Sequence, residues 1–209
     1  MWYDKLANKF RRFAITGLMK YIVMGMGAVY VLNLLFGGRL TSLLAFSRPA
    51  IMSGQFWRLV SFVFIPINSS PLFIFFALYF YWLIGDALER DWGTAKFNLF
   101  YITGILGTII SGLITGYATN HYLNLTLFFA FAILFPNFQL LLFFVLPIKI
   151  KWLAYINAAY FVWELIISSW PRRLALIVAV GNLLLFFLPG IKNQIQNYRR
   201  RKQWRDNFR

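Results

Sequence analysis

Long apolar segments alternate with short polar ones along most of the chain. Five of the apolar segments are each close to the roughly 20 residues that a helix needs to cross the hydrocarbon core of a bilayer. This pattern predicts membrane-spanning helices over residues 18–36, 71–85, 97–117, 152–169 and 174–190.

A sixth apolar segment is shorter. It begins near residue 124 and meets Phe135-Pro136-Asn137, and a second apolar run over residues 138–147 ends at a basic stretch. Two interpretations remain open. Either one span is kinked at Pro136, or the span is short and residues 138–147 lie at the membrane interface.

Two segments outside the spans are amphipathic. Residues 1–17 carry apolar positions at helical spacing among basic ones, which predicts a surface helix on the cytoplasmic leaflet. Residues 37–70 interleave apolar and polar positions, which predicts an interfacial or re-entrant loop. Such a loop cannot lie in open lipid, because its backbone polar groups would be unpaired.

Composition agrees with the pattern. Of the 209 residues, 60% are hydrophobic and only 13% are charged, against about 25% charged in soluble domains. Soluble enzymes, secreted domains and disordered tails are thereby excluded. The chain has no cysteine and one histidine, so disulfides and thiolate sites are excluded and neither a metal nor a cofactor is expected.

The formal net charge of +15 is concentrated at the ends. With six spans and a cytoplasmic N-terminus, 16 of the 21 Lys and Arg residues fall on the cytoplasmic side. The tail over residues 192–209 is basic and is expected to lie near membrane lipids. A surface helix, a membrane-bound basic arm and a disordered segment remain open for it. It carries no pattern typical of nucleic-acid binding.

The third span carries a stripe of small residues. They recur every fourth position and so share one helix face, which allows another helix to approach closely. These predicted packing residues are Gly104, Thr108, Gly112 and Gly116.

Two motifs flank the second span. The first loop contains Gly54-Gln55-Phe56-Trp57-Arg58-Leu59, and the span ends in Gly85-x-x-Leu88-Glu89-x-x-x-Gly93. In their order and spacing these motifs resemble the rhomboid superfamily over residues 18–190. The resemblance implies an all-α polytopic membrane protein, with a six-helix rhomboid-like bundle over residues 18–191 and an embedded first loop.

The catalytic pattern of rhomboid proteases is missing. Those enzymes pair a serine in a Gly-x-Ser-Gly motif in the fourth span with a histidine in the sixth. Here the fourth span reads Leu123-Asn124-Leu125-Thr126 and the sixth reads Gly181-Asn182, while Phe73 and Ala77 stand where a His and an Asn would build the oxyanion site. The chain therefore resembles the inactive, derlin-like branch, and no catalytic residue is expected.

Several polar residues have two interpretations. Trp57 and Arg58 form either an interfacial anchor or a lock that positions the first loop. The charged residues at 86, 89, 90 and 91 could include paired carboxylates for acid–base chemistry. A solvated turn, with Asp91 or Thr94 capping the next helix, explains them more simply.

Glu164 lies inside a predicted span, where an ionisable group is costly and usually has a partner. Asn157, Asn182 and Arg58 are its candidate partners, and either a packing role or a proton or substrate role fits. Asn182 is a second intramembrane polar residue and is expected to join helices.

These features favour a non-proteolytic membrane protein of the bacterial cytoplasmic membrane, with both termini cytoplasmic. It is expected to bind transmembrane segments of client proteins, or to perturb the bilayer, and so to assist membrane-protein handling or turnover. Two alternatives remain: an intramembrane protease with another nucleophile, such as Thr126, Ser168 or Ser169, and a small transporter centred on Glu164.

Overall fold

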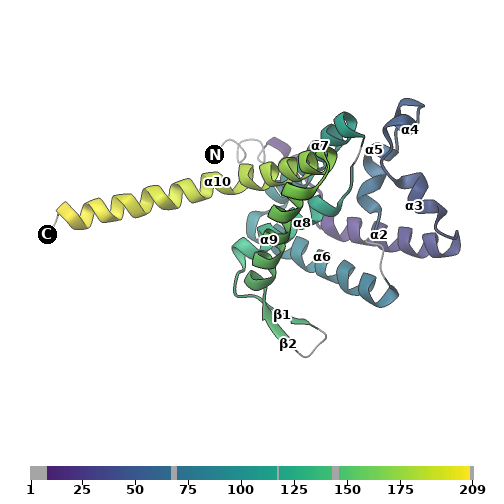
Figure 1. The fold of residues 1–209 in the computed structure, drawn as a ribbon. Coiled ribbons are helices and arrows are strands. Elements are labelled where there is room, and N and C mark those ends of the chain that lie inside the picture. The colour runs from purple at the N-terminus through teal and green to yellow at the C-terminus, as the bar shows by residue number, and fades with distance from the viewer. Residues whose placement is uncertain (1–8, 67–69, 117, 143–145, 208–209) are drawn as a thin grey trace.

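The structure, a computed structural model, describes residues 9–66, 70–116, 118–142 and 146–207. The chain is predominantly helical (Figure 1). The longer helices are α2 (Leu18–Leu35), α6 (Pro71–Trp92), α7 (Thr94–Thr115), α8 (His121–Leu134), α9 (Ile150–Ile167) and α10 (Trp170–Asn207). Short helices are α3 (Arg39–Leu44), α4 (Arg48–Met52), α5 (Arg58–Ser61) and the 3-10 turns η1 (Arg11–Phe13) and η2 (Phe62–Phe64).

Five helical segments in the described residues are long and apolar enough to cross a membrane, which makes the chain an integral membrane protein. They contain α2, α6, α7, α9 and the first half of α10. The sixth apolar helix, α8, has 14 residues, or about 21 Å of helix. It ends at Leu134, so a helix kinked at Pro136 is wrong. That this short helix is a fourth span stays a prediction.

α6 is longer than its apolar run. The predicted span stops at residue 85, but the helix continues through the charged residues to Trp92. It ends because Gly93 adopts a φ of +83°, which residues with a side chain rarely adopt. The interpretation of residues 86–91 as a solvated turn is therefore wrong. α7 starts directly after Gly93 with no side-chain cap from Asp91 or Thr94.

The N-terminal segment only partly follows its prediction. Residues 1–8 lie outside the described residues. The 3-10 turn over Arg11–Phe13 is followed by Ala14 in an extended conformation, so one helix through residue 17 is wrong.

The predicted loop over residues 37–70 folds into α3, α4, α5 and η2. Short helices satisfy much of the backbone hydrogen bonding locally, which an apolar environment requires. Two of the loop's aromatic residues, Phe46 and Phe62, are buried and contact each other edge to face with ring centroids 6.1 Å apart.

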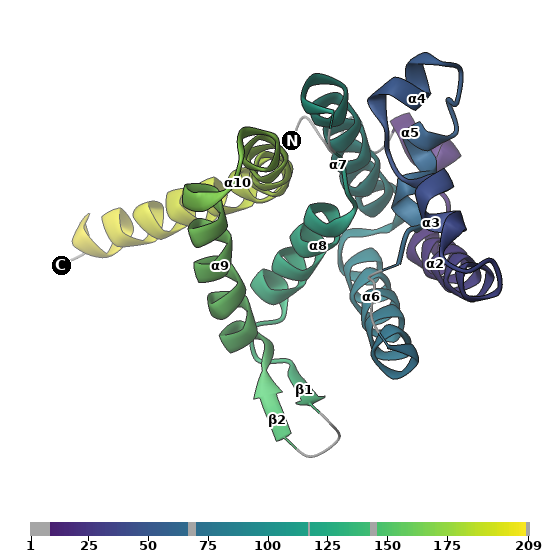
Figure 2. The ribbon, with the colours of Figure 1, turned by 45° about the vertical axis from the view of Figure 1, so that its right-hand side comes forward.

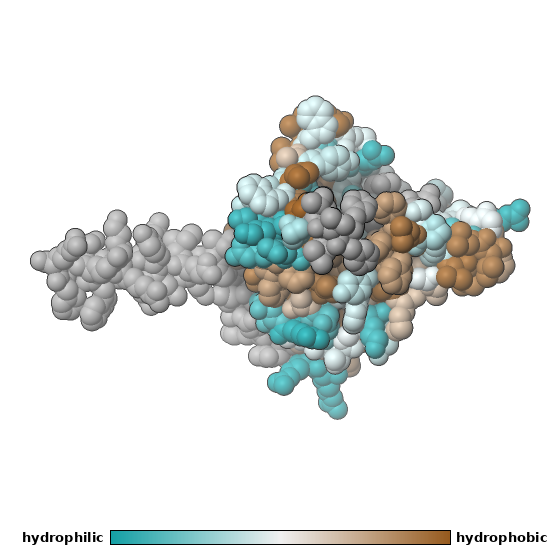
Figure 3. All heavy atoms as spheres, turned by 90° about the horizontal axis from the view of Figure 1, so that it is seen from below, coloured by the Kyte–Doolittle hydropathy of each residue, from teal (hydrophilic) through white to brown (hydrophobic). Residues whose placement is uncertain are grey.

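α8 lies in the middle of the bundle and packs against α6, α7, α9 and α10 (Figure 2). Nine of its residues are buried, although the helix is the shortest of the apolar ones. The other helices expose apolar side chains outward, as lipid-facing surfaces do (Figure 3). On α9 these include Trp152, Tyr155, Ile156, Tyr160, Trp163 and Ile167.

The sequence left two structures possible for residues 138–147, a continuation of a kinked span or an interfacial segment. The all-α prediction is wrong here, because the described part of this segment contains β-strands. β1 (Gln139–Leu142) pairs antiparallel with β2 (Leu146–Lys149), with Gln139 opposite Lys149. This hairpin projects from the bundle between α8 and α9 (Figure 2).

α10 continues without a break from its apolar half into the basic end of the chain. The predicted boundary at residue 191 is therefore not marked in the backbone. In Figure 1 the second half of α10 extends away from the bundle.

The packing of α2 on α6 generates a first prediction. A Cβ atom at Gly85 would lie 2.3 Å from Cβ of Met19. We expect Gly85→Ala to lower the free energy of unfolding by about 1–3 kcal/mol, because the two helices must separate. Gly181→Ala is the control, since no atom lies within 4 Å of its added Cβ. Thermal unfolding in detergent measures both variants, and equal effects would contradict this packing.

Candidate functional site

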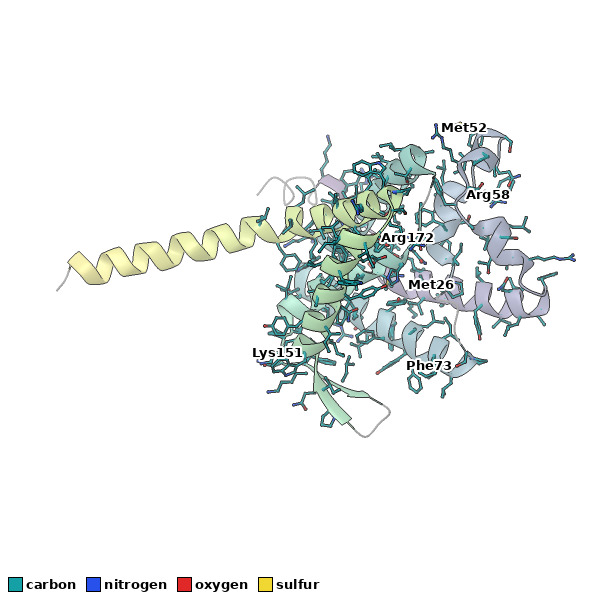
Figure 4. All side chains as sticks on the ribbon, viewed as in Figure 1. Met26, Met52, Arg58, Phe73, Lys151 and Arg172 are labelled. Atoms are coloured by element: carbon teal, nitrogen blue, oxygen red, sulfur yellow. The ribbon has the colours of Figure 1, made fainter. Side chains whose placement is uncertain are left out.

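The first-loop motif forms a lock around Arg58. This side chain is only 8% exposed. Its Nη1 donates to the carbonyl oxygens of Ser42 (2.7 Å) and Ala45 (2.8 Å), and its Nε donates to Oε1 of Gln55 (2.7 Å). The two carbonyls stand at the end of α3, where no intrahelical donor reaches them. Arg58 therefore holds α3 against α5. Figure 4 shows its position among the short helices.

The other motif residues of this loop lie at its surface. Trp57 is 55% exposed, and its Nε1 is 3.4 Å from the carbonyl oxygen of Leu43. Gly54 lies in the turn between α4 and α5. The lock interpretation thus fits Arg58 and Gln55. The interfacial anchor fits Trp57 and is wrong for the buried Arg58.

The span-end motif joins three helices. Oε1 and Oε2 of Glu89 accept the backbone N–H of Gly17, at 3.0 and 3.1 Å, and Oε1 also accepts the Thr94 hydroxyl at 2.9 Å. Gly17 immediately precedes α2, so the carboxylate lies at the positive end of that helix dipole. Gly85, one turn earlier on α6, gives α2 room to approach, and Gly93 turns the chain into α7.

The predicted small-residue stripe is a packing surface in three of its four positions. Gly104 lies against Leu123 and Asn182, and Gly112 lies against Phe46 and Ala118. Thr108 is buried between them, with its hydroxyl donating to the Gly104 carbonyl. Gly116 does not belong to the stripe. It ends α7 with a φ of +81°, and a Cβ there would meet nothing within 4 Å.

Glu164 is partnered by Tyr122, which the sequence analysis missed. The Tyr122 hydroxyl donates to Oε1 of Glu164 at 2.6 Å and so joins α8 to α9. Oε2 of Glu164 is buried and has no hydrogen-bond partner among the described residues. The available signal was a tyrosine at the start of the preceding apolar run.

The three predicted partners of Glu164 are wrong, because each is engaged elsewhere. Arg58 locks the first loop, and Nδ2 of Asn157 donates to the Leu153 carbonyl within α9. Asn182 joins α10 to α7, where its Oδ1 accepts the Thr103 hydroxyl (2.8 Å) and its Nδ2 donates to the Phe100 carbonyl (3.1 Å).

The residues compared with the protease pattern are dispersed. The Thr126 hydroxyl donates to the Leu123 carbonyl of its own helix at 2.7 Å. His121 is exposed at the start of α8 and its ring faces that of Tyr122. Phe73 is exposed near the start of α6 (Figure 4).

A cavity of about 570 Å³ lies beside the C-terminal half of α6. α6 contributes a stripe of residues at helical spacing, and α8 and the segment after it contribute phenylalanines. The lining residues are Tyr79, Trp82, Leu83, Asp86, Ala87, Arg90, Asp91, Phe131, Phe135 and Phe138.

The cavity exists because α8 is short. Phe80 and Phe128 contact each other and set α8 beside α6, but α8 stops at Leu134 while α6 continues to Trp92. The rings of Phe135 and Phe138 fold back onto Phe131, with centroids 5.0 and 5.3 Å away, and form one wall. The sequence signal was the spacing of Tyr79, Trp82 and Asp86 on one helix face, which the interpretation as a turn obscured.

The charged residues of the cavity carry both signs. Nη2 of Arg90 is 2.9 Å from Oδ2 of Asp86, one turn apart on α6. Asp91 has no hydrogen bond or ion pair in the part of the chain that the structure describes. No group of three His, Asp and Glu side chains suited to a metal occurs among the described residues.

Comparison of the chain with models of known protein families and with curated proteins gives no match. The integral membrane class therefore rests on the five long apolar segments.

The Arg58 lock generates a second prediction. Arg58→Ala leaves two helix-end carbonyls without a donor, so we expect the free energy of unfolding to fall by at least about 2 kcal/mol. Proteolysis within residues 37–66 should become faster. Arg48→Ala is the matched control because Arg48 is exposed in the same loop. Equal protease sensitivity of the two variants would refute the lock.

The bond between Tyr122 and Glu164 generates a third prediction. In a double-mutant cycle of Tyr122→Phe and Glu164→Gln, we expect a coupling free energy of about 0.5–1.5 kcal/mol, since the two side chains stabilise each other. Unfolding in detergent provides the four free energies. Simple additivity would show that the bond contributes nothing.

Proposed function

We propose that the chain is a non-proteolytic, rhomboid-like protein with six spans that binds transmembrane segments of client proteins and assists their handling or turnover. The order of the two motifs supports the rhomboid-like assignment, as does the arrangement of a locked first loop before α6 and a short α8 among longer helices. The proposal places the chain in a bacterial cytoplasmic membrane with both termini cytoplasmic.

The observation that carries this proposal is the cavity beside α6. A protein that receives another helix needs an apolar recess that its own helices leave unfilled. The early end of α8 leaves this recess, and aromatic side chains line it. Aromatic and aliphatic side chains are suited to packing against an apolar client helix, whose stability in the recess comes from close contact.

The distribution of basic residues supports an orientation of the bundle in the membrane. Glu89, at the end of α6, contacts the start of α2, so the cavity lies at the same end of the bundle as the N-terminal basic residues. Lys20, Arg90 and Lys96 belong to helix turns at this end. By the positive-inside rule this end is cytoplasmic.

The Tyr122 bond favours a packing role for Glu164 over transport. Oε1 of Glu164 accepts the Tyr122 hydroxyl and so joins α8 to α9, and Oε2 is buried away from the bundle surface. A binding function centred on the cavity needs neither oxygen to exchange protons.

Cysteine cross-linking tests the proposal, and the natural absence of cysteine means that only introduced thiols react. Trp82→Cys or Phe138→Cys places a thiol at the cavity, and Trp163→Cys places one on the exposed surface of α9. The probe is a synthetic apolar helix of about 20 residues with one cysteine near its cytoplasmic end, reconstituted with each variant in nanodiscs.

We expect the two cavity positions to cross-link several-fold faster than Trp163→Cys, because a bound helix spends longer at the cavity than random collision allows. Equal rates at all three positions would exclude the cavity as a client site. Thermal unfolding of each variant confirms that it is folded.

A further inference from the structure

The acidic residues of this protein are few and clustered. The chain has six Asp and Glu residues. Asp86, Glu89 and Asp91 lie in the last two turns of α6. Glu89 is engaged at the start of α2, while Asp86 and Asp91 both line the cavity.

These carboxylates stand at an otherwise basic end of the bundle. The Phe138 carbonyl accepts the backbone N–H of Ile150, so Lys149 and Lys151 flank the cavity segment in sequence and space. Lys96 lies over the ring of Trp92 at 5.2 Å. The two aspartates at the cavity are therefore negative side chains among mainly positive neighbours.

The cavity combines carboxylates with aromatic faces. Tyr79 and Trp82 lie 6.0 Å apart by ring centroids on α6, about two turns and one turn before Asp86. Three phenylalanine rings form the facing wall. Aromatic faces attract cations through the ring quadrupole, and carboxylates add charge-assisted hydrogen bonds. This combination fits an ammonium or guanidinium group.

The depth of the two carboxylates in the membrane restricts the kind of group that the cavity can bind. At 1.5 Å per residue, Asp86 and Asp91 lie about 22 and 30 Å along α6 from Pro71. The hydrocarbon core is about 30 Å thick, so Asp91 reaches the cytoplasmic boundary and Asp86 lies about one and a half turns inside it. Client helices carry their excess of Lys and Arg at this boundary, whichever way they cross the membrane.

We infer that the cavity recognises the Lys or Arg that flanks the cytoplasmic end of a client transmembrane helix. This inference rests on the proposed function and names its substrate class. Asp91 supplies the free carboxylate, and Tyr79 and Trp82 supply the ring faces. Arg90 is paired with Asp86 in this structure and yields that carboxylate to the client's cation.

Three peptides test the inference. They share one apolar core and one cross-linking cysteine, and carry Lys-Lys, Gln-Gln or Glu-Glu at the cytoplasmic end. We expect Phe138→Cys to capture the Lys-Lys peptide with about three- to tenfold higher apparent affinity than the Gln-Gln peptide, and the Glu-Glu peptide least. The lipid is phosphatidylcholine, which carries no net charge.

Variants of the cavity residues test which side chains cause the preference for the Lys-Lys peptide. Asp86→Asn with Asp91→Asn keeps the shapes and removes both charges, so we expect the Lys-Lys preference to fall to about one. Arg90→Gln should raise the preference, because it frees Asp86. Trp163→Ala is the matched control for Trp82→Ala, since Trp163 lies exposed on α9, and only the cavity variant should weaken binding.

The outcomes separate the inference from the function on which it rests. Equal capture of all three peptides at the cavity overturns the inference and leaves client binding intact. Absence of cavity-specific capture for every peptide overturns the proposed function itself. A Lys-Lys preference that survives the double Asn substitution also overturns the inference.

A lipid occupant gives a different result. Native mass spectrometry would then show phosphatidylcholine or phosphatidylethanolamine retained by the wild-type protein and lost from the double Asn variant. Blocking of Lys-Lys peptide capture by that lipid would reassign the cavity to an ammonium headgroup and overturn the inference.

Discussion

The contact between Glu89 and the start of α2 determines how the first three long helices are arranged. Its carboxylate lies at the N-terminal end of one helix, in the penultimate turn of a second and beside the first residue of a third. Asn98 strengthens the junction by exchanging hydrogen bonds with the backbone of Ile15. With that junction in place, α6 has one face against the core, at Ile84, Gly85 and Leu88, and the opposite face at the cavity.

Three buried polar side chains join separate segments of this bundle in the same way. Arg58, Asn98 and Asn182 are buried, and each bonds to backbone carbonyls of another segment. A buried polar group without partners is costly in an apolar surrounding, so each of these residues specifies one arrangement of the segments it joins. The helices of the bundle are therefore positioned by a few directional bonds, while apolar contact supplies most of the close packing.

Hydropathy alone predicts the long helices well. The predicted first span, residues 18–36, is within one residue of α2, because lipid crossing imposes length and composition together. The end of α6 was wrong by seven residues, because charged side chains at the interface are compatible with helix as well as with a turn. The hairpin was missed since a short run of Leu and Phe has no period that separates strand from helix.

The candidate site was less accessible from sequence. Gly85, Glu89 and Gly93 could be selected as a motif, but their shared role at one junction depends on Gly17, which lies far away in the chain. The bond between Tyr122 and Glu164 and the cavity were not predicted for the same reason, because both depend on which helices become neighbours. The spacing of residues along the sequence predicts which of them share a helix face, but it does not predict which helix packs against that face.

α10 has 38 residues and no break, so its length is about 57 Å. The hydrocarbon core accounts for about 30 Å of this length, and the remainder stands outside the bundle as one rigid rod (Figure 1). Asn182 ties the embedded half of that rod to α7. Any tilt of α10 that accompanies a change in the bundle is thereby magnified at its far end, where a tilt of about ten degrees displaces the tip by about 5 Å.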